Sequence, residues 1–185
     1  MPDAPFVASP DQAPSGPTAA VVEGQTVTAT TMAPNRLLIP SLGVYAVTDE
    51  TVMANGELVI NDNPAVVDRW AKSAPIIGTE GTVLMAGHVS VSGVRGALYP
   101  LVQVKPGALA YTTDSSGKVS AWQAESISAY VKADLPAWVW SATGKRQLVL
   151  VTCSGPVLSR TDADGKTHRS HRDNAVAVFV PARNT

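Results

Sequence analysis

The sequence lacks the features that define several large protein classes. Cys153 is the single cysteine, which excludes an internal disulfide and says little about the redox compartment. No run of about 20 apolar residues occurs, so no membrane-spanning helix is expected. The N-terminus has no basic region followed by an apolar one and therefore shows no signal peptide. The formal net charge of −1 argues against a general binder of nucleic acids or anionic membranes.

The composition that is present is that of a folded chain. Hydrophobic residues make up 45% and charged residues 16% of the 185 positions, which is typical of a protein with a core and not of a disordered one. This length accommodates one β domain and a tail.

Residues 1–34 differ in composition from the rest. They hold six prolines among Ala, Ser, Thr and Gly, and no Lys or Arg precedes Arg36. Such a segment buries too little apolar surface to offset its ordering entropy, so we expect an extended spacer with polyproline character. The alternative is that the Val- and Thr-rich residues 21–31 add an edge strand to the domain. The expected division is therefore a linker at 1–34 and a folded domain at 35–185.

From Arg36 onward, short β-forming runs alternate with turn signals such as Asn55-Gly56. Regularly spaced short strands with few helices predict an all-β barrel or sandwich. The predicted strands are residues 37–39, 44–47, 57–60, 82–88, 108–113, 118–132, 147–153 and 172–180.

Two helical segments and two loops are predicted between these strands. Asn63 followed by Pro64 is a helix-start signal, so a short helix is expected at 64–71. Asp134 is expected to cap a helical turn over residues 135–140. The segments 90–96 and 154–171 are expected to be polar loops.

Three of the predicted strands carry a chemically active side chain at one end. Cys153 ends the run 147–153, His88 ends 82–88, and Arg172 opens 172–180. A thiol, an imidazole and a guanidinium at strand ends form a candidate site for cysteine-based acyl transfer. The alternative for Cys153 is an inert, buried thiol that packs as a small hydrophobe.

Four segments resemble the sortases, the cysteine transpeptidases of Gram-positive cell surfaces. Leu150-Val151-Thr152-Cys153 is similar to their Leu-x-Thr-Cys signature, although Val149 stands where many sortases have threonine. Residues 36–44 resemble their opening strand. Ala86-Gly87-His88 resembles the histidine motif and Arg172-Asp173-Asn174 the arginine motif, in the same order along the chain. Among the classes, the actinobacterial class F is the most similar and class E the next.

The resemblance implies a fold, an activity and a location. The fold would be a closed β-barrel of about eight strands. The activity would be cleavage of a Leu-Pro-x-Thr-Gly-like sorting signal between Thr and Gly through a thioester on Cys153. The acyl group would pass to an amine of a cell-wall precursor or pilin, without cofactor or metal. We expect a monomer at the extracytoplasmic face, trimmed after a membrane anchor, with residues 1–34 as its stalk.

The resemblance also assigns roles to individual residues. His88 would protonate the departing amine. Arg172 stays protonated and would hold substrate carbonyls and the developing oxyanion. Thr152 would support substrate or orient the site through its hydroxyl. In sortases the loop before the cysteine strand forms a wall of the substrate groove, which nominates Leu135, Trp138 and Trp140.

Several alternatives stay open at this stage. Arg160 and Arg169 are rivals of Arg172, although both are typical of ordinary solvated charges. A zinc site of His168, His171 and Cys153 is disfavoured because only one thiol is available, and calcium activation is not predicted. A peptidoglycan L,D-transpeptidase would place a glycine before its cysteine, whereas Gly155 follows it here. A surface-displayed, non-catalytic β domain and a sortase that mainly hydrolyses its substrate are the other possibilities.

Overall fold

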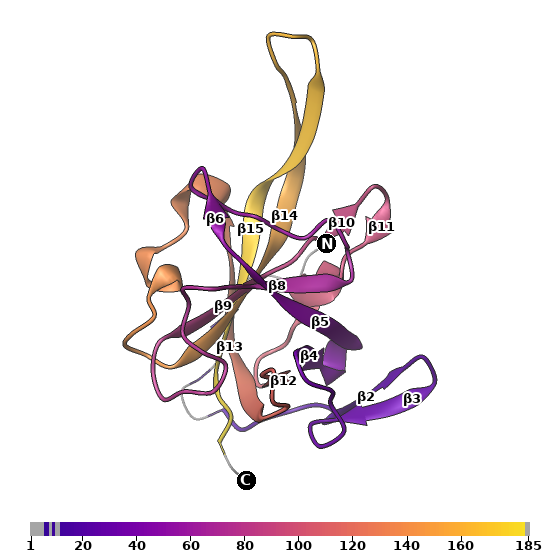
Figure 1. The fold of residues 1–185 in the computed structure, drawn as a ribbon, viewed down its shortest axis with the longest axis vertical. Coiled ribbons are helices and arrows are strands. Elements are labelled where there is room, and N and C mark those ends of the chain that lie inside the picture. The colour runs from indigo at the N-terminus through magenta and orange to yellow at the C-terminus, as the bar shows by residue number, and fades with distance from the viewer. Residues whose placement is uncertain (1–5, 8, 10–11, 184–185) are drawn as a thin grey trace.

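Eight strands close into a β-barrel in the computed structural model, which describes residues 6–7, 9 and 12–183 (Figure 1). Strand β13 pairs with both the first and the last of the other seven, which closes the barrel and confirms the predicted all-β fold. In order of pairing, the strands are β13 (Val119–Val131), β12 (Leu109–Thr113), β4 (Arg36–Ile39), β5 (Val44–Thr51), β8 (Val66–Trp70), β9 (Thr82–Ala86), β14 (Gln147–Thr161) and β15 (Thr167–Pro181).

The first part of strand β14, residues 148–151, is apolar and is buried on both faces. Leu148 and Leu150 point into the barrel core, whereas Val149 and Val151 belong to a second apolar cluster on the outside of the sheet. A strand covered on both sides is expected to be a continuous apolar run and not an alternating one. We call this second group of side chains the outer cluster, and it consists of Leu84, Ala86, Val139, Val149, Val151, Val176 and Val178.

The segment between β13 and β14 contains two short 3-10 helices and packs Leu135, Val139 and Trp140 against the rest of the outer cluster. The helices are η3 (Lys132–Asp134) and η4 (Ala137–Trp140), and neither has a side-chain cap, so the predicted capping role of Asp134 is wrong. Val139 is fully buried, and Trp140 packs edge-on against Trp70 with 5.4 Å between ring centroids. The segment between β13 and β14 thus forms a lid of apolar side chains over one face of the sheet.

The helix predicted at residues 64–71 is a strand. The Asn63 side chain accepts a hydrogen bond from the N–H of Ala65, which makes a turn and not a helix start. Strand β8 follows at once, parallel to β5 and antiparallel to β9. Pairing on both sides favours the β-branched Val66 and Val67 in extended form, and this tertiary preference overrides the local capping signal.

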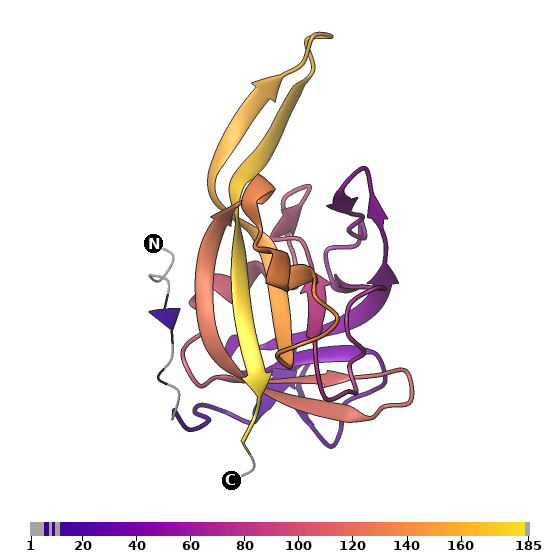
Figure 2. The same ribbon diagram turned by 90° about the vertical axis from the view of Figure 1, so that its left-hand side faces the viewer.

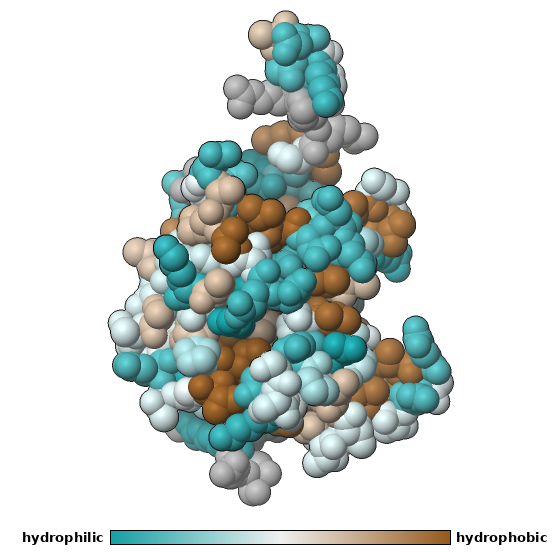
Figure 3. Space-filling model, viewed as in Figure 1, coloured by the Kyte–Doolittle hydropathy of each residue, from teal (hydrophilic) through white to brown (hydrophobic). Residues whose placement is uncertain are grey.

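The polar loop predicted at residues 154–171 is a two-stranded arm. Strands β14 and β15 remain paired past Cys153 and Arg172 and project away from the barrel in both views (Figures 1 and 2). The tip of the arm is hydrophilic (Figure 3). There the Asp162 carboxylate accepts hydrogen bonds from the N–H groups of Asp164 and Lys166, which closes the turn.

The segment before the barrel contains short strands in its described part. Strands β2 (Ala19–Val22) and β3 (Gln25–Thr28) form a hairpin that is a sheet of its own, and Ala20 and Val27 pack on the barrel. Strand β1 (Phe6–Val7) pairs with β13. Of the expected spacer, residues 1–5, 8 and 10–11 lie outside the described part, and the division between 34 and 35 stays a prediction.

The remaining elements are small. Two further hairpins are β6 (Met53–Ala54) with β7 (Glu57–Leu58) and β10 (Ser90–Val91) with β11 (Val94–Arg95), and the other 3-10 helices are η1 (Pro40–Leu42) and η2 (Tyr99–Gln103). Within the described residues, no helix has the length and apolar character needed to cross a membrane.

Candidate functional site

Neighbouring strands bring the three predicted catalytic residues to one end of the barrel. Strands β9 and β14 are parallel and pair Ala86 with Val151, so His88 and Cys153 each follow two residues beyond a matched pair. Side chains at positions i and i+2 share a face of a sheet, and Ala86 and Val151 both belong to the outer cluster. His88 and Cys153 therefore emerge at the same end and on the same face.

Arg172 comes from the strand on the other side of Cys153. Strand β15 is antiparallel to β14 and pairs Asn174 with Cys153. Arg172 lies two residues before Asn174, at the shift in pairing between Ser154 and Val157. The thiol and the guanidinium thus come from the interiors of β14 and β15 and the imidazole from just beyond β9, so the expectation that Cys153 ends a strand and Arg172 opens one is wrong. Cys153, on the middle strand, is half-buried.

Two hydrogen bonds hold the His88 and Cys153 segments together. The Thr152 hydroxyl donates to the Gly87 carbonyl at 2.9 Å, and the Gly87 N–H donates to the Val151 carbonyl at 3.1 Å. Thr152 is only 2% exposed, on the face opposite Cys153. Of the two roles predicted for Thr152, this position favours orientation of the site over contact with a peptide.

The chain returns closely past His88 after the β10–β11 hairpin. A Cβ added at Gly96 would overlap the carbonyl oxygen of His88 and lie 3.3 Å from its Cβ. The Gly96 N–H donates to the Val89 carbonyl at 2.9 Å. Glycine at position 96 therefore allows the returning chain to pack directly against the backbone of His88 and Val89.

Arg172 and Asp173 form a two-pronged ion pair. The Arg172 Nε–H donates to Oδ1 and its Nη2–H donates to Oδ2 of Asp173, both at 2.7 Å. The guanidinium lowers the pKa of the Asp173 carboxyl, and the carboxylate in turn raises the pKa of Arg172. Both groups are therefore charged across the neutral range, with the Arg172 side chain 54% exposed and that of Asp173 8% exposed.

Asp68 is a carboxyl group near His88 that the sequence analysis missed. It pairs with Ala86 across β8 and β9, is 2% exposed, and accepts a 2.7 Å hydrogen bond from the N–H of Asn61. Burial raises the pKa of Asp68, while its interaction with His88 lowers that pKa to a smaller extent. Its segment was predicted to be a helix, so no sequence signal pointed toward the site.

The three predicted groove residues have different positions. Leu135 and Trp140 pack partly buried on the outer cluster. Trp138 is 40% exposed, and its carbonyl accepts a hydrogen bond from the Thr82 hydroxyl at the start of β9. Thr82 lies about 13 Å along the strand from Ala86. Leu135 and Trp140 therefore pack over the face that carries Cys153, whereas the Trp138 side chain is not part of that packing.

The alternatives to this site are placed on the arm or beyond the described side chains. Arg160 and Arg169 lie on the arm, outward of Cys153 and Arg172. His171 lies beside the Gly155 carbonyl, with 2.9 Å between its Nδ1 and that oxygen. The side chain of His168 is outside the described part of the structure. Among the described side chains, no group of three His, Cys, Asp or Glu residues is placed to hold a metal ion.

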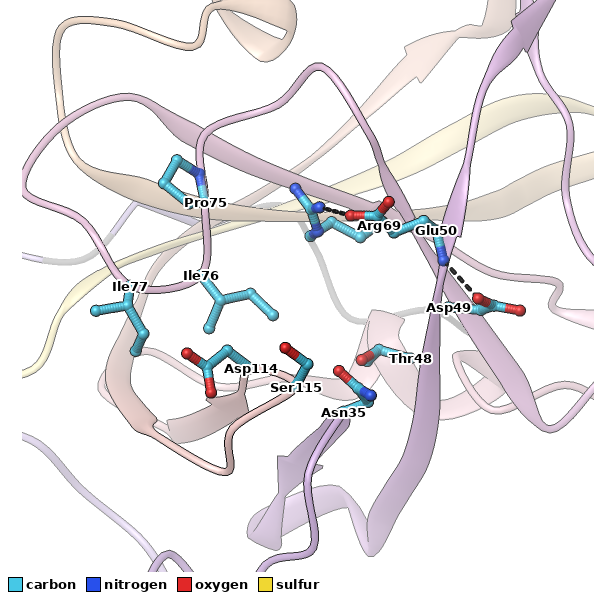
Figure 4. Close-up of a pocket in the computed structure, with 10 residues that line it drawn as sticks. All are labelled: Asn35, Thr48, Asp49, Glu50, Arg69, Pro75, Ile76, Ile77, Asp114 and Ser115. Carbon is cyan, nitrogen blue, oxygen red and sulfur yellow. Dashed lines mark hydrogen bonds and ion pairs between the residues drawn. The ribbon is translucent and has the colours of Figure 1, made fainter.

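A cavity lies at the other end of the barrel. It has a volume of about 470 Å³ and opens between Ile76 and Ile77 on one side and Thr48 and Asp114 on the other (Figure 4). Residues 75–77 precede the start of β9, whereas His88 follows its end. This cavity is therefore separate from the face that carries Cys153.

Comparison with known proteins identifies relatives of the chain. Residues 37–169 match the family model described as the Sortase domain. No match was found among curated proteins.

Solved structures resemble the fold at low sequence identity. Sortase C1 from Streptococcus agalactiae superposes with a TM-score of 0.59 and 15% identity, covering 82% of this chain and 68% of that one. The lid mutant of sortase A from Corynebacterium diphtheriae gives 0.58 and 15%, covering 81% and 70%. Sortase C-1 from Streptococcus pneumoniae gives 0.59 and 12%, covering 82% and 67%. At these identities the likeness shows the shared fold.

Proposed function

The chain belongs to the sortase family, and from this premise we propose that it is a cysteine transpeptidase whose nucleophile is Cys153. The observation that carries the proposal is the placement of His88, Cys153 and Arg172 on three neighbouring segments at one end of the barrel, with β14 paired to both β9 and β15. In this proposal the substrate is a Leu-Pro-x-Thr-Gly-like sorting signal, cleaved between Thr and Gly.

The first half of the reaction forms a thioester. The Cys153 thiolate attacks the threonine carbonyl, so that an S–C bond forms and the oxygen becomes an oxyanion. As the intermediate collapses, the C–N bond to glycine breaks and His88 gives its proton to the departing amine. The second half reverses these steps with a new amine, which forms an amide bond and releases the thiolate.

Arg172 supplies positive charge where the oxyanion develops. Its guanidinium remains protonated throughout, so it acts as a hydrogen-bond donor and not as a base. Loss of one such donor typically lowers the rate on the order of 100- to 1000-fold. The half-exposed side chain of Arg172 leaves N–H groups accessible to a peptide.

The partly buried Leu135 and Trp140, which pack over the outer cluster, offer an apolar wall for the substrate. An extended peptide that binds along this wall would meet Cys153 at its end. An apolar leucine followed by a rigid proline suits such a surface. Trp138, which is 40% exposed, borders this groove in the proposal.

Cell-surface proteins that carry sorting signals are the proposed substrates, and an amine of a cell-wall precursor or pilin is the acceptor. The enzyme would act as a monomer at the extracytoplasmic face. The sequence likeness to class F, and next to class E, belongs to this proposal. A non-catalytic domain would keep its thiol inaccessible, so the half-buried state of Cys153 favours the enzyme.

Mass spectrometry of the folded protein with a Leu-Pro-x-Thr-Gly peptide tests the proposal. We expect a thioester adduct on Cys153 and, with an added amine, an acceptor-linked product, both absent in C153A. A protein that forms no adduct, cleaves no peptide and resists alkylation at Cys153 would be a non-catalytic domain. Ready alkylation without an adduct would point to a different peptide as the substrate.

A further inference from the structure

The base of the arm contains a clamp that holds the guanidinium of Arg172. We propose that Asp173 is a positioning residue that fixes the orientation of Arg172 before substrate binds, and that Gly155 provides the space for the Asp173 carboxylate. The inference rests on the proposed catalytic role of Arg172. Neither Asp173 nor Gly155 takes part in the reaction scheme above.

A break in strand pairing makes the clamp possible. Side chains of consecutive residues normally point to opposite faces of a strand, which keeps them apart. Here the pairing shifts between Ser154, opposite Asp173, and Val157, opposite His171, so Arg172 faces the unpaired residues 155–156. Such a bulge bends and twists the strands locally. The bulge therefore lies opposite Arg172, where the strand must depart from regular geometry for the Arg172 and Asp173 side chains to make two hydrogen bonds.

The bulge also lies directly against the Asp173 carboxylate. A Cβ added at Gly155 would overlap Oδ2 of Asp173 and lie 3.1 Å from Cγ, and the backbone there has φ of 72°. Both the close approach and the left-handed conformation favour glycine. The Gly155 carbonyl is next to His171 Nδ1, which ties the bulge to the opposite strand. Gly155 therefore forms one wall of the carboxylate site.

The clamp anchors one edge of the guanidinium and leaves the other free. Asp173 takes one N–H from Nε and one from Nη2, so both N–H groups of Nη1 and the second of Nη2 face outward from the pair. The carboxylate is almost buried while the arginine side chain is half exposed. A planar guanidinium held along one edge has a defined orientation at its other edge.

This arrangement predicts a specific catalytic effect. A misplacement of about 1 Å in a catalytic group can lower the rate about 100-fold, so a loosened Arg172 should act more slowly even though its charge is kept. D173N keeps the size of the side chain but removes its charge and one acceptor. D164N makes the same change at the tip of the same arm and is the matched control.

The activity test measures acylation of Cys153 by the peptide in single turnover. We expect D173N to slow acylation about tenfold, D164N to change it less than about twofold, and D173N to have no further effect in an R172A background. An equal effect of D173N with and without Arg172 would overturn the clamp, because Asp173 would then act independently of the guanidinium.

A second measurement does not depend on activity. In the wild-type protein, NMR should show slower solvent exchange of the Arg172 Nε–H than of the Arg95 Nε–H. Arg95 stacks on Tyr99 and has no carboxylate partner in the described residues. The slow exchange should be lost in D173N and G155A and kept in D164N.

The two measurements separate the clamp from the proposed function. If the wild-type protein is not acylated by any sorting peptide, the transpeptidase proposal fails, while the Nε–H exchange still decides the clamp. If D173N does not fold, the comparison of Arg172 with Arg95 in the wild-type protein is sufficient. Equal exchange at these two arginines would refute the clamp.

Discussion

Replacing Thr152 by valine tests how the site is held together. The change keeps the shape of the side chain and removes the hydroxyl that donates to the Gly87 carbonyl at 2.9 Å. Thr152 is 2% exposed, so the carbonyl loses a partner that water does not easily replace. Such an unpaired buried acceptor costs about 2 kcal/mol, which lowers the Tm of a chain of this size by about 4–8 °C. Because Gly87 directly precedes His88, acylation should also slow, by about tenfold.

The assay for Thr152 combines thermal unfolding with single-turnover acylation of Cys153. T152S is the control, since it keeps the hydroxyl and loses only a methyl group. We expect T152S to acylate at close to the wild-type rate and T152V to be impaired in both measurements. A T152V protein with unchanged Tm and acylation rate would refute the reasoning, because the Gly87 segment would then be held by other contacts.

Three further changes test the surroundings of the site. G96A should reduce stability and acylation, because its Cβ would overlap the carbonyl of His88. In G78A the nearest atom is 3.4 Å from the new Cβ, so that variant should unfold like the wild type. Burial raises the pKa of Asp68, so this group contributes stability below its unfolded pKa of about 3.9 and loses it as pH rises through the higher folded value. D68N should therefore gain stability relative to the wild type between about pH 3.5 and pH 7 in urea unfolding, and a difference independent of pH would contradict this. W140A should cost about 2 kcal/mol or more in urea unfolding and raise the KM for the peptide, whereas the exposed W138A should cost less than half as much; equal losses would show that the edge-on contact with the neighbouring tryptophan ring is unimportant.

The barrel could be predicted from the sequence because several of its strands are recognisable from short apolar, β-forming runs. The run that ends at Cys153 is apolar over residues 148–151 and forms the predicted strand, although this strand continues past Cys153 into the arm where a turn was expected. Which strands are neighbours is a different matter. The pairing of β9 with β14 brings Gly87 and Thr152 together across 65 residues, and no local pattern specifies that contact.

The errors of the sequence analysis share a physical cause. The Asn63 signal is local and typical of a helix start, but the strands on either side of β8 decide its conformation. The arm was predicted to be a loop because its residues are polar. Two polar strands can nevertheless pair when they continue a pairing that is already fixed within the barrel. Asp68 was missed because the Asn63 signal predicted a helix there. The contact of Asp173 with Arg172 was missed because it depends on a bulge in strand pairing that the sequence does not display.

The pairing of β13 with β15, which closes the barrel, has a consequence for folding during synthesis. Strand β15 pairs with β14 on one side and closes the barrel on the other, and it also carries Arg172. Pairings between distant segments form slowly, because the chain loses loop-closure entropy before the contacts that stabilise the pairing are made. A growing chain at the ribosome therefore holds the cysteine strand in an unfinished sheet until β15 has been synthesised. In the proposed mechanism the site lacks Arg172 until then, so it is complete only in the finished molecule.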